Sequence, residues 1–162
     1  MLFLHDVFLA HNSQEKPWLR KIYDELIARG KRVFFDEESI RHEEPIAEQL
    51  AFAIRHSALI LVYFGPSGQG RFHKLEAALV RRLRQRQRSA ELIVGLAEGA
   101  NIEDTPAYFQ SFPELNFGPL YFEDGISRVI QAVERIKAKP QGDDARPAAR
   151  GANNDFLDAV AA

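Results

Sequence analysis

The sequence contains no cysteine among its 162 residues. Without thiols the chain can form no disulfide, thiolate metal site or cysteine nucleophile, a composition typical of proteins from a reducing cytosol. No apolar run approaches the roughly 20 residues that cross a bilayer. The apolar start, residues 1–4, is too short for a signal peptide and lacks a basic leader. The sequence therefore predicts a cytoplasmic protein without membrane contact.

A strong excess of charge of one sign is missing as well. The formal net charge is −2, with 27% charged and 46% hydrophobic residues, which describes an ordinary globular domain. Nucleic-acid binders usually carry a basic excess, so direct nucleic acid binding is not expected. The scattered histidines His5, His42, His56 and His73 have no metal-ligand spacing, and no metal site is expected.

Short apolar runs alternate with segments of helical periodicity along the chain. The predicted strands are 7–10, 32–35, 58–63, 92–96 and 119–122. Helices are predicted from Pro17 to a left-handed cap at Gly30, then over 45–54, 72–85 and 126–136. Residues 99–118 are expected to be irregular apart from one short helix. We therefore expect one folded domain over 1–139 and a flexible tail or linker over 140–162, which is rich in Ala, Gly, Pro and Asp.

This alternation predicts right-handed βαβ units and hence a parallel sheet with helices on both faces. Five strands of this kind commonly take the order 2-1-3-4-5, which is a flavodoxin-like α/β fold. Its switch point lies between the first and third strands, and ligands bind there at the carboxyl ends of the strands. Residues 10–13 and 64–67 follow those two strands. The topology alone therefore predicts a binding site between these two segments.

Three stretches of the chain form a combined pattern: residues 6–13, residues 32–36 followed by Ile40, and the Gly-rich 65–70 followed by Phe72 and Glu76-Ala77-Ala78-Leu79. Together they resemble the TIR (Toll/interleukin-1 receptor-like) domain of the bacterial type. Each stretch is weak alone, but together they occur in the family's order and on the expected elements. The resemblance extends from about residue 6 to 137. It implies either an enzyme that hydrolyses or cyclises NAD or a signalling adaptor without catalysis.

By this resemblance Glu76 takes the position of the catalytic carboxylate. Residues of the first stretch, and residues at or after the second and third strands, would hold the dinucleotide: Ala10, His11, Asn12, Phe34, Asp36, Phe64, Gly65, Ser67 and Phe72. Phe34 and Phe72 stand where the family usually has tryptophan. NAD is then the substrate, and no cofactor is expected. One fixed carboxylate suits this reaction, because loss of nicotinamide builds positive charge on the ribose, as in glycoside hydrolysis.

The same residues also have simpler interpretations. A glutamate near a helix start often faces solvent and is favoured there by the helix dipole. The glycine-rich segment 65–70 lacks the Gly-Lys-Ser/Thr ending of a P-loop and can serve only as a turn. Phe34 can belong to the core, and His11 can lie in a loop without a role. A receiver domain is set aside, because Phe64 and its neighbours stand where the phospho-acceptor Asp is needed.

We therefore expect an NAD+ nucleosidase or ADP-ribosyl cyclase-type enzyme, acting as an effector of bacterial antiviral defence. The alternative is a non-catalytic TIR module that only joins partners. Charge placement predicts homotypic assembly, because the sequence holds an acidic stretch (Asp36, Glu37, Glu38, Glu43, Glu44, Glu48) and a separate basic stretch (Arg71, Lys74, Arg81, Arg82, Arg84, Arg86, Arg88) that could meet between copies. Contacts between two different patches are head-to-tail and can extend into filaments. We expect the enzyme to become active on such self-assembly.

Overall fold

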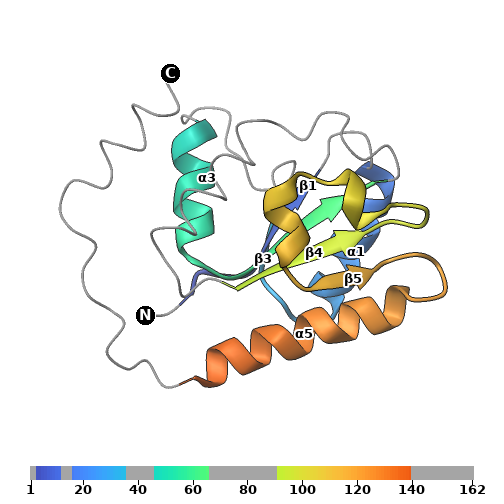
Figure 1. The fold of residues 1–162 in the computed structure, drawn as a ribbon. Coiled ribbons are helices and arrows are strands. Elements are labelled where there is room, and N and C mark those ends of the chain that lie inside the picture. The colour runs from blue at the N-terminus through green and yellow to red at the C-terminus, as the bar shows by residue number, and fades with distance from the viewer. Residues whose placement is uncertain (1–2, 12–15, 36–45, 66–90, 140–162) are drawn as a thin grey trace.

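The computed structural model describes residues 3–11, 16–35, 46–65 and 91–139. Within these ranges one parallel sheet forms in the order β2-β1-β3-β4-β5 (Figure 1). Its strands are β1 (His5–His11), β2 (Val33–Phe35), β3 (Ser57–Phe64), β4 (Glu91–Leu96) and β5 (Glu114–Asn116). The strand order predicted from the sequence is thus confirmed.

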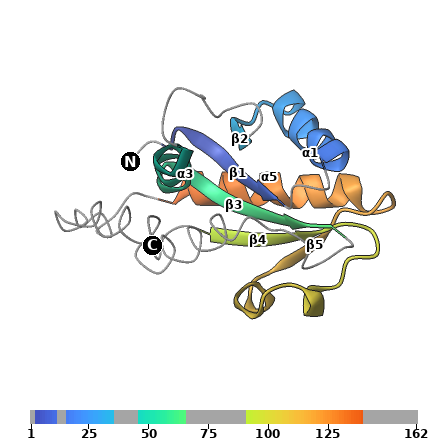
Figure 2. The same ribbon diagram turned by 90° about the horizontal axis from the view of Figure 1, so that it is seen from above.

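Three helices in the described ranges pack on the two faces of this sheet. They are α1 (Lys16–Ala28), α3 (Ile46–Arg55) and α5 (Phe122–Ala138). One core cluster joins α1 and α5 to the sheet, and the other joins α3 to the opposite face. The short 3-10 helices η1 (Ile102–Asp104) and η2 (Ala107–Ser111) lie beside β4 and β5, away from α1 (Figure 2). The predicted helix 72–85 lies outside the described residues.

Alternate side chains of the inner strands divide between the two core clusters. In β1, Val7 and Leu9 pack on the side of α1 and α5, whereas Phe8 and Ala10 pack on the side of α3. Every residue of β3 is buried. A central parallel strand is covered on both faces, so it appears in the sequence as a continuous apolar run rather than an alternating one.

The boundaries of α1 follow the local signals of the sequence. Pro17 is the second residue of the helix, where its missing N–H leaves no intrahelical bond unmade. Gly30 has φ +79° and its N–H bonds to the carbonyl of Ile27 at 2.9 Å, as expected for a left-handed cap. Trp18 joins the helix to the far edge of the sheet, because its Nε1–H donates to the carbonyl of Phe117 at 3.0 Å.

The predicted fifth strand, Pro119–Phe122, is wrong. The strand is β5, and Phe122 is already the first residue of α5. Because β5 is a half-exposed edge strand, it lacks the apolar run that marked the inner strands. After it, Phe117 is fully buried, and the N–H of Gly118 bonds back to Asn116 Oδ1 at 2.7 Å to turn the chain. Leu120 is 90% exposed, so part of the run assigned to the strand lies on the surface.

Candidate functional site

The carboxyl ends of β1 and β3 lie side by side at one edge of the sheet. His11 is in register with Tyr63, and Phe64 and Gly65 follow as buried residues. The carbonyl of Phe64 accepts a hydrogen bond of 3.0 Å from the N–H of Ala97, so the end of β3 is also tied to β4. This is the switch point of the fold, where ligands of open parallel sheets bind. The ends of these two strands are therefore adjacent, as the predicted strand order requires, and a binding site between them stays a prediction.

Three of the predicted dinucleotide-binding residues share the face that α3 covers. Ala10, Phe34 and Phe64 belong to the same core cluster and are 2%, 6% and 0% exposed. The ring of Phe34 stacks on Phe8 at 5.3 Å between centroids and 6° between planes. The ring of Phe64 packs against Phe109 at 5.4 Å. Ala10 and Phe64 thus lie in the core near the carboxyl ends of their strands, whereas the Phe34 ring packs against Phe8 and His5, nearer the amino-terminal ends. Contact of these residues with NAD stays a prediction.

The remaining predicted site residues lie largely outside the described part of the chain. This applies to the catalytic position Glu76 and to Asn12, Asp36, Ser67 and Phe72. His11 is described through its backbone, as the last residue of β1. The basic stretch also lies outside, and of the acidic stretch only Glu48 is described, exposed in the first turn of α3. The roles of these residues stay as the sequence predicts them.

A charged cluster lies at the opposite side of the sheet, at the amino-terminal ends of the strands. The predictions from the sequence do not include it. Asp6 is 1% exposed; its carboxylate accepts bonds from the Arg32 backbone N–H at 2.8 Å, the Arg32 guanidinium at 3.3 Å and Lys137 Nζ at 3.0 Å. Burial alone raises the pKa of Asp6, but these hydrogen bonds and the charge of Lys137 bring it below its ordinary value. One feature of the sequence could have indicated this cluster, because Asp6 is a carboxylate within an apolar run. The cluster joins β1, β2 and α5.

His5 lies next to this cluster, with its ring edge-on to Phe34 at 5.5 Å. Burial, followed by the nearby charge of Arg32, lowers its pKa below the ordinary value, and its Nδ1 is buried without a hydrogen-bond partner.

In the described ranges, no three His, Asp or Glu side chains come together in a way that could hold a metal ion. Nor does any helix of those ranges have the length and apolar content to cross a membrane.

Similarity to known proteins covers most of the chain. Residues 7–130 match the family model of the TIR domain. Over 141 residues, 82% of this chain, the sequence is 26% identical to the NAD(+) hydrolase TirS of Staphylococcus aureus and covers 49% of that protein. The chain thus spans about half the length of this curated relative.

Solved structures share the fold. A metazoan TIR-STING receptor from C. gigas, solved with 2',3'-cGAMP, has a TM-score of 0.66 at 18% identity, over 81% of this chain and 40% of that one. The TIR domain of the Toll-related receptor TRR-2 of Hydra magnipapillata has a TM-score of 0.57 at 15% identity, over 78% and 98% of the two chains. The sheet order and the match over most of the folded residues lead to one conclusion: the protein belongs to the TIR domain family.

Proposed function

We propose that this TIR domain cleaves the bond between nicotinamide and ribose in NAD, by hydrolysis or cyclisation. The observation that carries the proposal is the similarity to a relative named as an NAD(+) hydrolase over 82% of this chain. The switch point between β1 and β3 supports it, because it provides the edge at which the fold binds ligands. The proposed catalytic residue is Glu76, and NAD is the substrate of a reaction that uses no cofactor.

The proposed reaction requires one fixed carboxylate from the protein and little else. Nicotinamide leaves as a neutral ring, so its departure needs no strong general acid. The barrier lies in the positive charge that develops on the ribose, and a fixed carboxylate shielded from water stabilises that charge. Attack by water then releases ADP-ribose, whereas attack by the adenine of the same molecule gives a cyclic product.

We further propose that activity depends on homotypic assembly and serves bacterial antiviral defence from the cytoplasm. Support for assembly comes from the opposed acidic and basic stretches of the sequence. It also comes from the fold shared with the TIR domains of the activated Roq1 resistosome, at a TM-score of 0.53 and 15% identity over 97% of each chain. A head-to-tail contact would place the acidic stretch of one copy against the basic stretch of the next.

The test is the substitution Glu76→Gln in the full chain, incubated with NAD at high protein concentration. We expect nicotinamide release to fall at least about 100-fold, the order seen when an electrostatic stabiliser of a transition state is removed. The free energy of unfolding should change by less than about 0.5 kcal/mol. Glu103→Gln, an exposed glutamate of η1, is the matched control and should retain full activity.

Two outcomes would contradict the proposal. Retention of a tenth or more of the activity in Glu76→Gln assigns the reaction to another carboxylate. Absence of nicotinamide release by the unaltered protein, at every concentration at which it assembles, favours the non-catalytic interaction module instead.

A further inference from the structure

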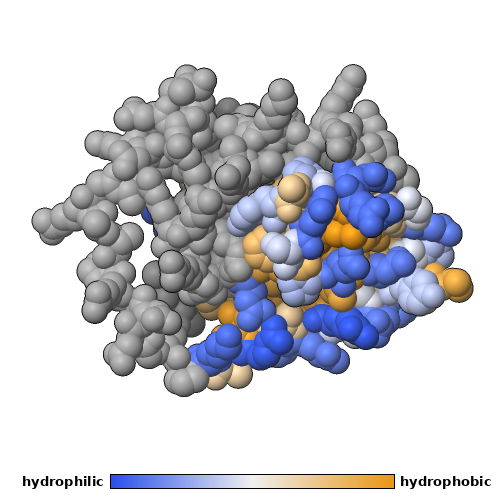
Figure 3. Space-filling view, in the orientation of Figure 1, coloured by the Kyte–Doolittle hydropathy of each residue, from blue (hydrophilic) through white to orange (hydrophobic). Residues whose placement is uncertain are grey.

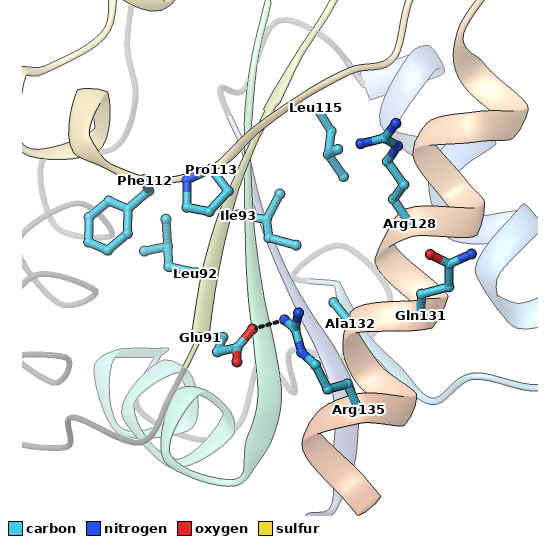
Figure 4. Close-up of a pocket in the computed structure, with 10 residues that line it drawn as sticks. All are labelled: Glu91, Leu92, Ile93, Phe112, Pro113, Leu115, Arg128, Gln131, Ala132 and Arg135. Atoms are coloured by element: carbon cyan, nitrogen blue, oxygen red, sulfur yellow. Dashed lines mark hydrogen bonds and ion pairs between the residues drawn. The ribbon is translucent and has the colours of Figure 1, made fainter.

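A groove runs between α5 and β4, and Glu91, the first residue of β4, lines it (Figure 4). We call it the β4–α5 groove; its volume is about 610 Å³. Its apolar lining is Leu92, Ile93, Phe112, Pro113, Leu115 and Ala132. Arg128, Gln131 and Arg135 of α5 line its other side (Figure 4). In Figure 3, hydrophobic surface is visible between the hydrophilic surface over α5, at the bottom of the view, and the hydrophilic surface above it.

The groove exists because β5 is shorter than β4. β5 pairs only with Val94 to Leu96, so the first half of β4 has no strand beside it on this side among the described residues. The N–H of Val94 bonds outward to the carbonyl of Pro113, and the carbonyl of Leu96 accepts from the N–H of Phe117. Peptide groups two residues apart face the same way in a strand. The N–H and C=O of Leu92 therefore also face the groove.

The chain leaves α5 at one end of this groove. Arg135 pairs with the carboxylate of Glu91 at 2.6 Å, and Lys139, just after the helix, approaches the same carboxylate at 3.6 Å. Glu91 is the first residue of β4 and lines the groove. Any segment that follows Lys139 therefore starts at the groove, without having to cross the molecule.

Residues 155–160, which we call the tail motif, match the groove in chemistry. The motif combines apolar Phe156, Leu157 and Val160 with acidic Asp155 and Asp158. The apolar side chains suit the lining, and the two carboxylates suit Arg128 and Arg135 of α5. Both arginine side chains are about 60% exposed and accessible to a second carboxylate, although each already has an acidic neighbour in its own domain.

The connecting segment is long enough for the motif to reach the groove of its own chain. Residues 140–154 separate Lys139 from the motif, and a random-coil chain of that length would have a root-mean-square span of roughly 20 Å. The groove extends along α5 from Arg135 to Arg128, which is roughly 10 Å of helix. A tether of this kind gives an effective concentration in the millimolar range, which favours binding in cis over binding of a second copy.

We propose that the tail motif binds in the β4–α5 groove of its own chain. Its apolar side chains cover Phe112, Pro113 and Leu115, the accessible part of the apolar lining, and its carboxylates join the arginines of α5. The groove is thereby an internal docking site for this segment of the chain. This inference goes beyond the proposed function and does not depend on it.

The absence of cysteine makes disulfide trapping a clean test. In the full chain, the pair Gln131→Cys and Ala159→Cys places one thiol on the groove and one in the tail motif. We expect an intramolecular disulfide to form at least about tenfold faster than in the control pair Glu48→Cys and Ala159→Cys, whose first thiol is on α3. Disulfide formation requires Cα atoms within about 7 Å, so its rate reports the docked state. The rate should not change with protein concentration.

Charge and apolar variants separate docking from chance encounter. In the trapping pair, Arg135→Glu should slow disulfide formation several-fold, and adding Asp158→Arg should restore it. Replacing both Phe156 and Leu157 by alanine should lower the rate of disulfide formation in the groove pair to that of the control pair. Equal rates in the groove and control pairs would overturn the proposal. So would disulfide-linked dimers that form faster as concentration rises, because a second copy would then fill the groove.

Discussion

At the scale of single residues, a buried carboxylate and a half-buried imidazole lie at the amino-terminal ends of the strands. The Asp6 carboxylate is almost inaccessible to solvent, yet its hydrogen bonds to Arg32 and Lys137 offset the loss of hydration. His5 has no comparable compensation, because its Nδ1 is buried without a partner. The two neighbours therefore respond to pH in different windows.

Asp6→Asn should lower the free energy of unfolding at pH 7 by about 1–3 kcal/mol, measured by urea denaturation. The loss stays below that of a fully buried pair because Lys137 and Arg32 side chains are 39% and 53% exposed and can regain water. Since the folded pKa of Asp6 is lowered, its contribution is present above the unfolded carboxylate pKa, ordinarily 3.8, and is lost as pH falls through the folded pKa. The difference between the two proteins should therefore close in acid.

The control for this prediction is Asp124→Asn, which removes an exposed i,i+4 pair with Arg128. It should change stability by less than about 1 kcal/mol at any pH. Equal effects of the two substitutions would show that the cluster around Asp6 adds nothing beyond a surface ion pair.

His5 should make the protein less stable as pH falls below 6.5, its ordinary pKa. The folded pKa is lowered, so in this range the unfolded chain binds a proton that the folded protein does not. The free energy of unfolding therefore decreases from above pH 6.5 down to the folded pKa of His5, and this contribution is constant below it. NMR titration of the His5 ring should give a midpoint below 6.5, and His5→Gln should flatten this part of the stability profile. A midpoint at or above 6.5 would contradict the prediction.

At the scale of elements, the join between β5 and α5 depends on a close fit around Phe117. A Cβ on Gly125, in the first turn of α5, would lie 2.9 Å from the Phe117 ring and 3.1 Å from the backbone oxygen of Asn116. A Cβ on Gly95 of β4 would lie 3.0 Å from the same ring. Two glycines thus make room for one buried aromatic side chain, and the helix accepts glycine there in spite of its low helix propensity.

Gly125→Ala should therefore destabilise the protein by about 1–3 kcal/mol, although alanine is the better helix former. The overpacking outweighs the propensity gain because one of the obstructing atoms is backbone. Thermal unfolding with a two-state fit measures the effect. In the double variant with Phe117→Leu the two losses should add to less than their sum, because a smaller side chain relieves the contact. Full additivity, or stabilisation by Gly125→Ala alone, would contradict this account.

At the scale of the whole molecule, function is predicted to depend on contact between copies. The acidic and basic stretches nearly cancel in the net charge but form opposed patches in the sequence. Exposed charges are screened beyond about 8–10 Å near physiological salt, so the contact they form should weaken as salt rises.

Association and NAD cleavage should therefore decrease together with increasing salt, and specific activity should rise with protein concentration. Reversing Glu43 and Glu44 to lysine should reduce both, as measured by light scattering and nicotinamide release. In the matched control, Glu103 and Asp104, which are exposed in η1, are both replaced by lysine. Activity that is independent of both salt and concentration would identify a catalytic monomer.

The sequence by itself determined the architecture. Apolar runs at 58–63 and 92–96 predicted the inner strands, and Pro17 and Gly30 predicted the limits of α1, because burial on two faces and special backbone positions leave local signatures. The TIR family also followed from the sequence, whereas a ligand site at the switch point stays a prediction. The assignment of Glu76 came from the family resemblance and stays a prediction.

Only the tertiary structure decided features that depend on residues far apart in the chain. The edge strand β5 has no apolar run of its own, because its position is set by pairing with β4 and by the burial of Phe117. The partners of Asp6 lie 26 and 131 residues away, so no local pattern indicates them. The β4–α5 groove likewise appears only when a short strand leaves half of a longer one uncovered beside a helix. Local patterns determine elements, whereas packing between distant segments determines edges, buried charges and grooves.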